Sequence, residues 1–444
     1  MMNQNNRLRL YTFASSAKIQ EGKYYTKKYL HFDNIVSFQN IKDKVTNPCW
    51  VSRHGFYPFI HFQMKFSKYN KKENKKKSKE REIYYASHVD SYIYKYYGDI
   101  LNYKYNDVVD KLGFSEVSIA YRNNFPGKSN IHFAKEVISF LTSQNEAFIY
   151  VADFTKFFDK IDHKYLKEKI KSVLGVKTLP DDFYTVFKNI TKFSWIEKKD
   201  IDEYLKEKYG VNKPNLTRYF SEKEFRNFKK GNTYKNTKDF GIPQGAGISS
   251  VFSNIYLLEF DRLLNAYAKK NNGLYRRYCD DLIIVIPIKN SHPFNREEHE
   301  NIIEKARKQI PNLELQKEKT EKYFYKNNEI TNMENQTTKL NYLGFNFDGV
   351  NVKIREKSLF KYFNRAYKKV RICNRLTQKT NQKSQRRKLY KTYTHLGKKS
   401  RGYGNFLTYA SRAQKEFDKN STTNNLMEHQ VKNHWKRINA RLKK

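Results

Sequence analysis

Three aspartates are placed where their carboxylates can serve one reaction. Asp153 follows the apolar run AFIYVA (147–152), and Asp280 and Asp281 are adjacent within the apolar segment YCDDLII (278–284). Short apolar runs predict buried strands, and two acids held between such strands are costly unless a cation neutralises them. Carboxylates are good ligands for Mg²⁺, and phosphodiester synthesis uses two such ions. We therefore expect Asp153, Asp280 and Asp281 to bind two Mg²⁺ ions, with Mn²⁺ as an alternative.

A glycine-containing segment lies between these aspartates. FGIPQGAGISSVFSNIYLLEFD (240–261) predicts a turn followed by a helix. Its glycines favour close approach of the backbone to a base pair, and the side chains of Gln244 and Asn254 can hydrogen-bond a nucleotide or a template. Taken alone, Asp153 could cap a helix, the aspartate pair could form a turn, and the glycines could form a loop. The order of the three segments favours a polymerase site instead.

This order closely resembles motifs A, B and C of reverse transcriptases. The segment LELQKEKTE (313–321) is similar to motif D, and LNYLGFNF (340–347) is similar to motif E, the primer grip. The segment IAYRNNFPGKSN (119–130) resembles the basic fingers segment. The resemblance covers residues 85–350 and implies an RNA-directed DNA polymerase, a nucleotidyltransferase that uses dNTPs.

The resemblance also implies roles for individual residues. Lys319 would protonate the pyrophosphate leaving group. Phe158, five residues after Asp153, would pack under the sugar and clash with a 2′ hydroxyl, although it could also be a core residue. The other implied contacts are with substrate (Phe154, Gln244, Gly245, Arg122, Lys128) or with nucleic acid (Tyr278, Asn254, Leu343, Gly344).

The charge of the chain indicates a polyanionic partner. Lys and Arg outnumber Asp and Glu by 87 to 45, which gives a formal net charge of +42. A genome rich in Lys codons would explain the lysines but not the scarcity of acids, so nucleic acid is the expected partner. Residues 357–415 contain no acid and repeat apolar residues at helical spacing. They predict a basic helical domain in which Arg365, Lys369, Arg386 and Arg387 contact phosphates.

We expect an α+β right-hand fold with fingers, palm and thumb. Residues 1–84 are predicted to be an N-terminal extension, with a strand at 57–66 and a lysine-rich run at 67–82. That run is interpreted as a solvated hairpin tip in preference to a nucleic-acid-binding arm. The predicted fingers are residues 85–146, and the palm, an antiparallel sheet backed by helices, is 147–355 with an insertion at about 180–238. The basic helical thumb is 356–444.

Several features that the sequence lacks indicate where the protein is located. The three cysteines lie far apart, and the chain has neither a signal-peptide core nor an apolar run long enough to span a bilayer. We therefore expect a cytoplasmic protein without membrane contact. Homo-oligomers are neither predicted nor excluded.

The subfamily is expected from what surrounds the motifs. Pro243-Gln244, the absence of a V-T-G element and the short tail after motif E resemble the unknown-group bacterial reverse transcriptases. Many of these act in phage defence, and the compact form resembles systems that pair the enzyme with a neighbouring noncoding RNA. The resemblance implies this RNA as template and DNA as product. Untemplated or protein-primed synthesis, or a maturase-type RNA-binding protein, are the alternatives.

Overall fold

An antiparallel sheet lies at the centre of the computed structural model, which describes residues 24–70, 75–210, 215–289, 294–381, 386–399, 402, 404–419 and 422–442. The strand order of this central sheet is β6-β7-β3-β8-β9, and all neighbours run antiparallel. The strands are β3 (Glu146–Asp153), β6 (Leu274–Tyr278), β7 (Asp281–Pro287), β8 (Glu321–Lys326) and β9 (Glu329–Thr331). The predicted strand before Asp153 and the predicted hairpin around Asp280 are both confirmed.

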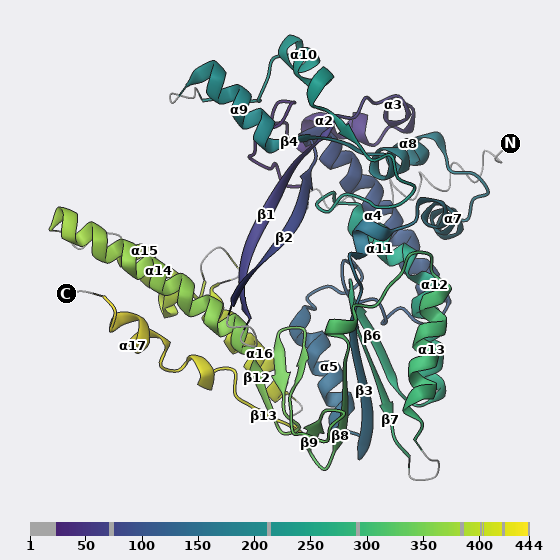
Figure 1. The fold of residues 1–444 in the computed structure, drawn as a ribbon, viewed down its shortest axis with the longest axis vertical. Coiled ribbons are helices and arrows are strands. Elements are labelled where there is room, and N and C mark those ends of the chain that lie inside the picture. The colour runs from purple at the N-terminus through teal and green to yellow at the C-terminus, as the bar shows by residue number, and fades with distance from the viewer. Residues whose placement is uncertain are drawn as a thin grey trace.

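Helices connect these strands in a β-α-β-β-α-β order, a recurrent way to build a four-stranded unit. Between β3 and β6 the chain forms several helices, and between β7 and β8 it forms α13. The helices are α6 (Phe157–Lys160), α7 (His163–Leu174), α11 (Ser249–Tyr256), α12 (Leu258–Lys270), α13 (Arg296–Lys308) and η2 (Lys317–Lys319), after α4 (His88–Lys111) and α5 (Asn130–Thr142). Figure 1 shows α12 and α13 on one side of the central sheet and α5 on the other.

Both faces of the central sheet are buried because its side chains alternate and each face packs against its own core. Phe148 and Ile284 face a core shared with α4, α11, α12 and α13. Ile149 and Ile283 face a second core shared with α5 and the C-terminal strands. Both faces of the sheet are therefore covered, and Asp153, a predicted site residue, lies at the end of β3.

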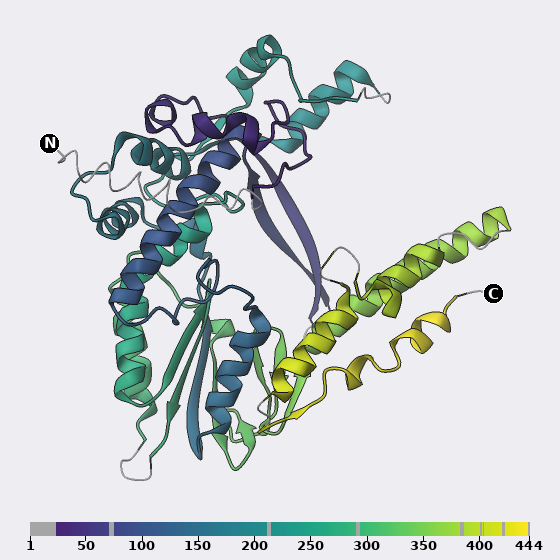
Figure 2. The same ribbon diagram turned by 180° about the vertical axis from the view of Figure 1, so that it is seen from behind.

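A second sheet combines two segments that are distant in the sequence. Its order is β2-β1-β4-β5, with β1 and β4 parallel. The strands are β1 (Phe59–Asn70), β2 (Lys75–Tyr85), β4 (Ser194–Glu197) and β5 (Tyr234–Lys235), and the helices around them are α2 (Phe38–Val45), α3 (Pro48–Ser52), α8 (Asp181–Thr191), α9 (Lys198–Tyr209) and α10 (Glu222–Asn232). We call this the N-terminal sheet. Figure 2 shows it, from behind, above the central sheet.

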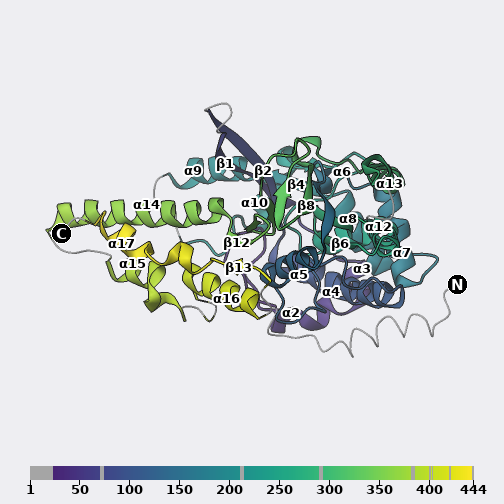
Figure 3. The ribbon, with the colours of Figure 1, turned by 90° about the horizontal axis from the view of Figure 1, so that it is seen from below.

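Strand pairing adds detail to two sequence predictions about this region. The run 67–82 lies in an antiparallel strand pair, in agreement with a hairpin, and its residues 67–70 pair with 75–78 while 79–82 pair with 63–66. The insertion at 180–238 supplies β4 and β5 to the N-terminal sheet, which begins in the predicted N-terminal extension. Long-range strand pairing of this kind leaves no local signal in the sequence. Beyond β4, the β1–β2 ribbon projects away from the body, as the view from below shows (Figure 3).

The C-terminal part is basic and helical, as predicted. It starts with a small sheet of β10 (Leu340–Tyr342), β11 (Phe345–Phe347), β12 (Asn351–Ile354) and β13 (Asn424–Asn425). The helices that follow are α14 (Glu356–Thr380), α15 (Arg386–Tyr393), η3 (His395–Gly397), α16 (Phe406–Asp418), η5 (His429–Val431) and α17 (His434–Asn439). Helix α14 extends outwards from the body (Figure 1). Among the described residues, no helix is long and apolar enough to cross a membrane.

Candidate active site

The three predicted aspartates meet at one end of the central sheet. Asp153 is the last residue of β3 and lies directly opposite Asp281, the first residue of β7. Asp280 lies in the two-residue loop between β6 and β7, and its carbonyl accepts a hydrogen bond from the Phe154 backbone N–H at 3.3 Å. The register of two strand pairs therefore fixes the positions of all three carboxylates.

Burial and mutual repulsion both raise the pKa values of Asp153 and Asp281. Desolvation raises the pKa of the Asp153 carboxyl, Asp280 raises it further, and Lys319, which contacts Asp153 Oδ2, opposes the shift. Desolvation, followed by the charges of Asp280 and Asp153, raises the pKa of Asp281 to about 6, even though the residue is partly open to solvent. Among the described residues, the three carboxylates thus outnumber Lys319 and Arg355, the two cations that oppose these pKa shifts.

A divalent cation fits this donor set chemically. Asp153 Oδ1 is buried and has no hydrogen-bond partner, which is costly unless a cation or donor binds it. Oxygen donors from three carboxylates are the ligands that Mg²⁺ prefers. Among the described residues, however, no three His, Cys, Asp or Glu side chains are already arranged to hold a metal ion.

Arg277 supports the hairpin of β6 and β7, in which Asp280 and Asp281 lie. Its guanidinium is fully buried and pairs with the equally buried Asp261, at 2.6 and 2.7 Å. The same group donates to the Cys279 carbonyl at 2.8 Å and to Asn254 Oδ1 at 3.2 Å. Cys279 has φ of 60°, an unfavourable conformation for a side chain with a Cβ, so these bonds hold a strained loop in place.

The glycine turn lies next to Phe158. The Ile242 N–H donates to the Phe158 carbonyl at 2.9 Å, and the half-buried Phe158 ring packs against Phe157. Gln244 hydrogen-bonds Asp159, which lowers the pKa of that carboxyl against the larger effect of desolvation. Phe158 and Gln244 thus both lie at the glycine turn beside Asp159, while Phe154 is a buried core residue.

The backbone at Gly245 lies very close to strand β2. A Cβ at this position would lie 2.3 Å from the Tyr84 carbonyl oxygen, and φ is 120°. The Tyr84 N–H also donates to the Gln244 carbonyl at 2.9 Å. The glycine therefore lets the turn dock on β2, a role that the sequence did not predict, and its contact with a substrate stays a prediction.

Two predicted contact residues are used internally. Asn254 is 1% exposed, accepts from Ser118 Oγ and donates to the Ala120 carbonyl. Arg122 donates to the Ser115 and Ser118 carbonyls and contacts Asn106. The prediction of direct template contact is therefore wrong for the buried Asn254, whereas substrate contact by the partly exposed Arg122 stays a prediction. Both side chains order the loop that precedes α5, because buried polar groups need partners.

The remaining predicted contacts fall into three places. Lys128 is exposed in the loop before α5, and Tyr278 is half-buried at the end of β6. Leu343 and Gly344 form the β10–β11 turn with φ of 43° and 94°, and Asn130 donates to the Leu343 carbonyl at 2.9 Å. In the C-terminal helices, Arg365, Lys369 and Arg387 are exposed, whereas Arg386 is partly buried.

Several side chains around the three aspartates were not among the predicted site residues. Arg355, at the start of α14, lies close enough to Asp281 to oppose the rise of its pKa. The half-exposed Tyr121 has φ of 60° and hydrogen-bonds Cys279. Arg277 and Asp261 carried a usable signal, because charged residues within apolar segments are usually buried pairs. Tyr121 and Arg355 carried none, since their closeness to the aspartates is set by tertiary structure.

A family match agrees with this geometry. Residues 104–347, more than half of the chain, match the model of the family described as "Reverse transcriptase (RNA-dependent DNA polymerase)", and this span contains all three aspartates and Lys319. The chain belongs to the reverse transcriptase family.

Solved structures similar to this reverse transcriptase include telomerases. Telomerase from Candida albicans, in complex with a TWJ fragment of telomeric RNA, is 15% identical with a TM-score of 0.40, and the match covers 72% of this chain and 52% of that one. Apo telomerase from Candida tropicalis is 12% identical with a TM-score of 0.42, over 73% and 54% of the two chains. This reverse transcriptase thus spans about half the length of those telomerases. No curated protein matches it.

Proposed function

We propose that this protein is an RNA-directed DNA polymerase that adds dNTPs to a primer by two-metal phosphoryl transfer. The observation that carries the proposal is the meeting of Asp153, Asp280 and Asp281 at the end of the central sheet, with Lys319 on Asp153. When bound, two Mg²⁺ ions would activate the primer hydroxyl and stabilise charge on the phosphates.

The protein's own residues do the rest. Asp153, Asp280 and Asp281 hold the cations, and Lys319 faces the site from η2, where it can donate a proton to the leaving group. The Ile242 N–H holds the Phe158 backbone, and the Phe158 ring, which packs against Phe157, would exclude a 2′ hydroxyl and thereby select dNTPs. Arg277 keeps the hairpin in register, and Lys128 supplies an exposed cation for incoming phosphates.

In this proposal the three parts of the structure act as a right hand. The central sheet is the palm, the N-terminal sheet with α4 and α5 forms the fingers, and the C-terminal helices form the thumb. Arg365, Lys369, Arg386 and Arg387 belong to a segment without acids and would contact duplex phosphates. Tyr278, Leu343 and Gly344 would contact the primer.

The test is a primer-extension assay with an RNA template, dNTPs and Mg²⁺. Wild-type protein should make DNA complementary to the template, and Asp280→Ala should make none while keeping its melting temperature. Product formed equally by both proteins, or by neither, would overturn the proposal. DNA still attached to denatured protein would indicate a protein primer, and product formed without template would indicate untemplated synthesis.

We further propose that the natural template is a noncoding RNA and that synthesis serves phage defence in the cytoplasm. The support is the resemblance to compact unknown-group enzymes and the net charge of +42, which suits a large RNA partner. Sequencing of RNA and DNA copurified with wild-type protein and with Asp280→Ala tests the first point. Phage plating on cells that carry each version tests the second, since only the active version should protect.

A further inference from the structure

A row of aromatic rings crosses one face of the N-terminal sheet. Tyr84 on β2, Trp195 on β4 and Tyr234 on β5 succeed one another, with ring centroids 5.9 Å apart for Tyr84 and Trp195 and 5.8 Å apart for Trp195 and Tyr234. The last two rings are stacked with an interplanar angle of 22°. Strand register explains the row, because Trp195 pairs with Tyr234, and side chains opposite each other share a face.

The outer end of this row is open to solvent. Tyr234 is 50% exposed and lies on β5, the two-residue edge strand of the sheet, so its ring is not buried in a core. Trp195 is partly buried, and its Nε1 donates to Glu197 at 3.0 Å, while Glu197 also hydrogen-bonds His61. The indole N–H is thus satisfied within the protein. Trp195 lies edge-on to Tyr84, with an interplanar angle of 81°, and stacks on Tyr234, so the exposed Tyr234 offers the ring face on which a base can stack.

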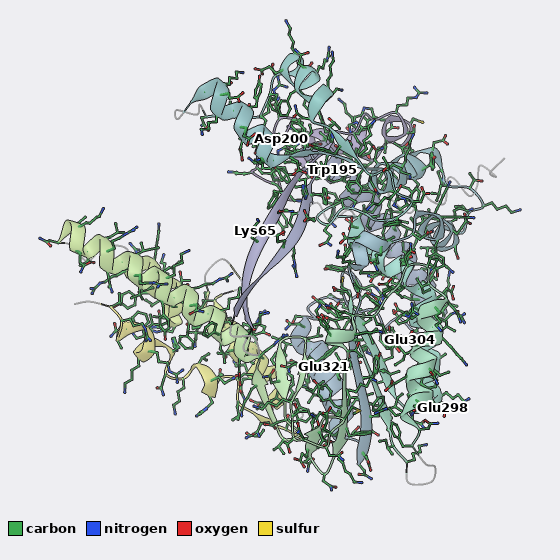
Figure 4. The ribbon with its side chains drawn as sticks, viewed as in Figure 1. Lys65, Trp195, Asp200, Glu298, Glu304 and Glu321 are labelled. Atoms are coloured by element: carbon green, nitrogen blue, oxygen red, sulfur yellow. The ribbon has the colours of Figure 1, made fainter. Side chains whose placement is uncertain are left out.

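The inner end of the row adjoins the candidate active site. Tyr84 holds the glycine turn through its bond to the Gln244 carbonyl, and the same turn bonds Phe158 through Ile242. The row therefore runs from the side of the site that holds Phe158 to the surface. Figure 4 shows Trp195 where the β1–β2 ribbon leaves the helical upper part, with Lys65 further along the ribbon.

Charges around the row are mixed. Lys235 is exposed next to Tyr234, and Lys192 lies nearby on Asp239 at 2.8 Å. Carboxylates of Glu82, Glu197 and Asp159 lie close to Tyr84 and, after desolvation, raise the pKa of its hydroxyl to about 12. Such a surface attracts phosphates less than the thumb does, so the rings themselves must provide the binding. Stacking of bases on aromatic faces is tolerant of sequence and requires unpaired bases.

We propose that Tyr84, Trp195 and Tyr234 form a stacking platform for single-stranded nucleic acid, namely the unpaired template before it enters the active site. The proposal rests on the proposed polymerase function and adds the path of the template. A duplex cannot use the platform, because its base faces are hidden in the helix. The solvent end, Tyr234, is where a template base would first stack.

The test compares two template–primers with the same duplex, one blunt and one with an unpaired 5′ template extension of about eight nucleotides. Binding is measured by fluorescence anisotropy. The extension should tighten binding to wild-type protein, and Tyr234→Ala should lose most of this gain, about five-fold or more. Tyr234→Phe should keep the gain because stacking uses the ring. Binding of the blunt duplex should not change in either variant.

Tyr184→Ala is the matched control. Tyr184 on α8 is 44% exposed and carries Lys167 at 4.9 Å from its ring centre, so it is an exposed aromatic in a basic setting outside the row. Three results would overturn the platform and leave the proposed function intact. They are a full gain in binding from the extension in Tyr234→Ala, a loss of this gain in Tyr184→Ala, and no gain in wild-type protein that binds the blunt duplex. Wild-type protein that binds neither duplex would instead contradict the proposed function, and the platform with it.

Discussion

Asp153 and Asp281 face each other across the β3–β7 ladder, so two carboxylates occupy one non-local strand pair at the end of a buried sheet. A strand pair of like charges is destabilising. The fold tolerates it here because Lys319 contacts one of the two and the other remains open to solvent.

Asp281→Asn should therefore stabilise the metal-free protein while abolishing DNA synthesis. The folded-state pKa of about 6 exceeds the ordinary value of 3.8, so ionisation of Asp281 opposes folding above pH 6. The rise in melting temperature should be full at neutral pH and shrink as the pH falls from 6 towards 4. Differential scanning calorimetry measures it. An unchanged or lower melting temperature would contradict the prediction, and Asp110→Asn, an exposed acid on α4, is the control.

Metal binding should weaken in the same pH range. Protonation of Asp281 as the pH falls through about 6 removes a ligand charge, so Mn²⁺ should bind several-fold more weakly at about pH 5.5 than at about pH 7.5. Electron paramagnetic resonance of free Mn²⁺ gives the affinity without catalysis. In Asp281→Asn the affinity should be low at both pH values. A pH-independent affinity in wild-type protein would count against this carboxylate as a ligand.

Arg277→Met should destabilise the protein strongly. Removing one member of a fully buried ion pair leaves Asp261 uncompensated, which costs roughly 3–5 kcal/mol in the free energy of unfolding. Urea denaturation measures the loss. The double change Arg277→Met with Asp261→Leu should be less destabilised than the single change. A double variant destabilised by the sum of the losses in Arg277→Met and Asp261→Leu would show that the pair is not coupled.

Arg277→Lys tests the positioning of the hairpin. Lysine keeps the charge but cannot reach Asp261, Asn254 and Cys279 together. We expect kcat to fall at least about ten-fold while KM for dNTP changes little, since the catalytic carboxylates shift and the nucleotide side does not. A rise in KM alone would contradict a role in holding the hairpin.

Phe158→Ala should relax discrimination against ribonucleotides. Removal of the ring opens space for a 2′ hydroxyl, and the ratio of kcat/KM for dNTP over rNTP should fall by about ten-fold or more. Single-nucleotide incorporation measures this ratio. A lower melting temperature with an unchanged ratio would show instead that Phe158 is only a core residue.

Gly245→Ala should disrupt the contact between the glycine turn and β2. The added Cβ would meet the Tyr84 carbonyl at 2.3 Å in a backbone conformation that suits glycine. Both melting temperature and primer extension should fall. Gly247→Ala is the control, because a Cβ there would lie 3.8 Å from the Lys95 Cα and the φ of Gly247 is ordinary. Equal effects of the two changes would contradict the close approach.

The sequence was most informative where chemistry and local pattern coincide. The run before Asp153 and the apolar residues around Asp280 and Asp281 predict strands, and their order predicts that the acids meet. The basic helical tail was predictable because Tyr362, Ala366 and Val370 repeat at helical spacing and are buried together.

The rest depends on tertiary contacts. The sheet formed by Phe59–His61 and Trp195–Glu197 joins segments far apart in the sequence, so the two were assigned to different domains. The internal bonds of Asn254 and Arg122 could not be foreseen, because polar residues near a site look the same in sequence whether they bind substrate or support a loop. The contact of Gly245 with Tyr84 could not be predicted either, because it joins segments that are far apart in the sequence.

The pairing of β1 with β4 has a consequence during synthesis. More than a hundred residues separate these strands, so the first sheet cannot close until the chain has been made well past the first catalytic aspartate. High contact order slows folding and prolongs exposure of unpaired strand edges. Nascent protein should thus depend on chaperones, or on early capture by its nucleic-acid partner, until translation passes residue 235.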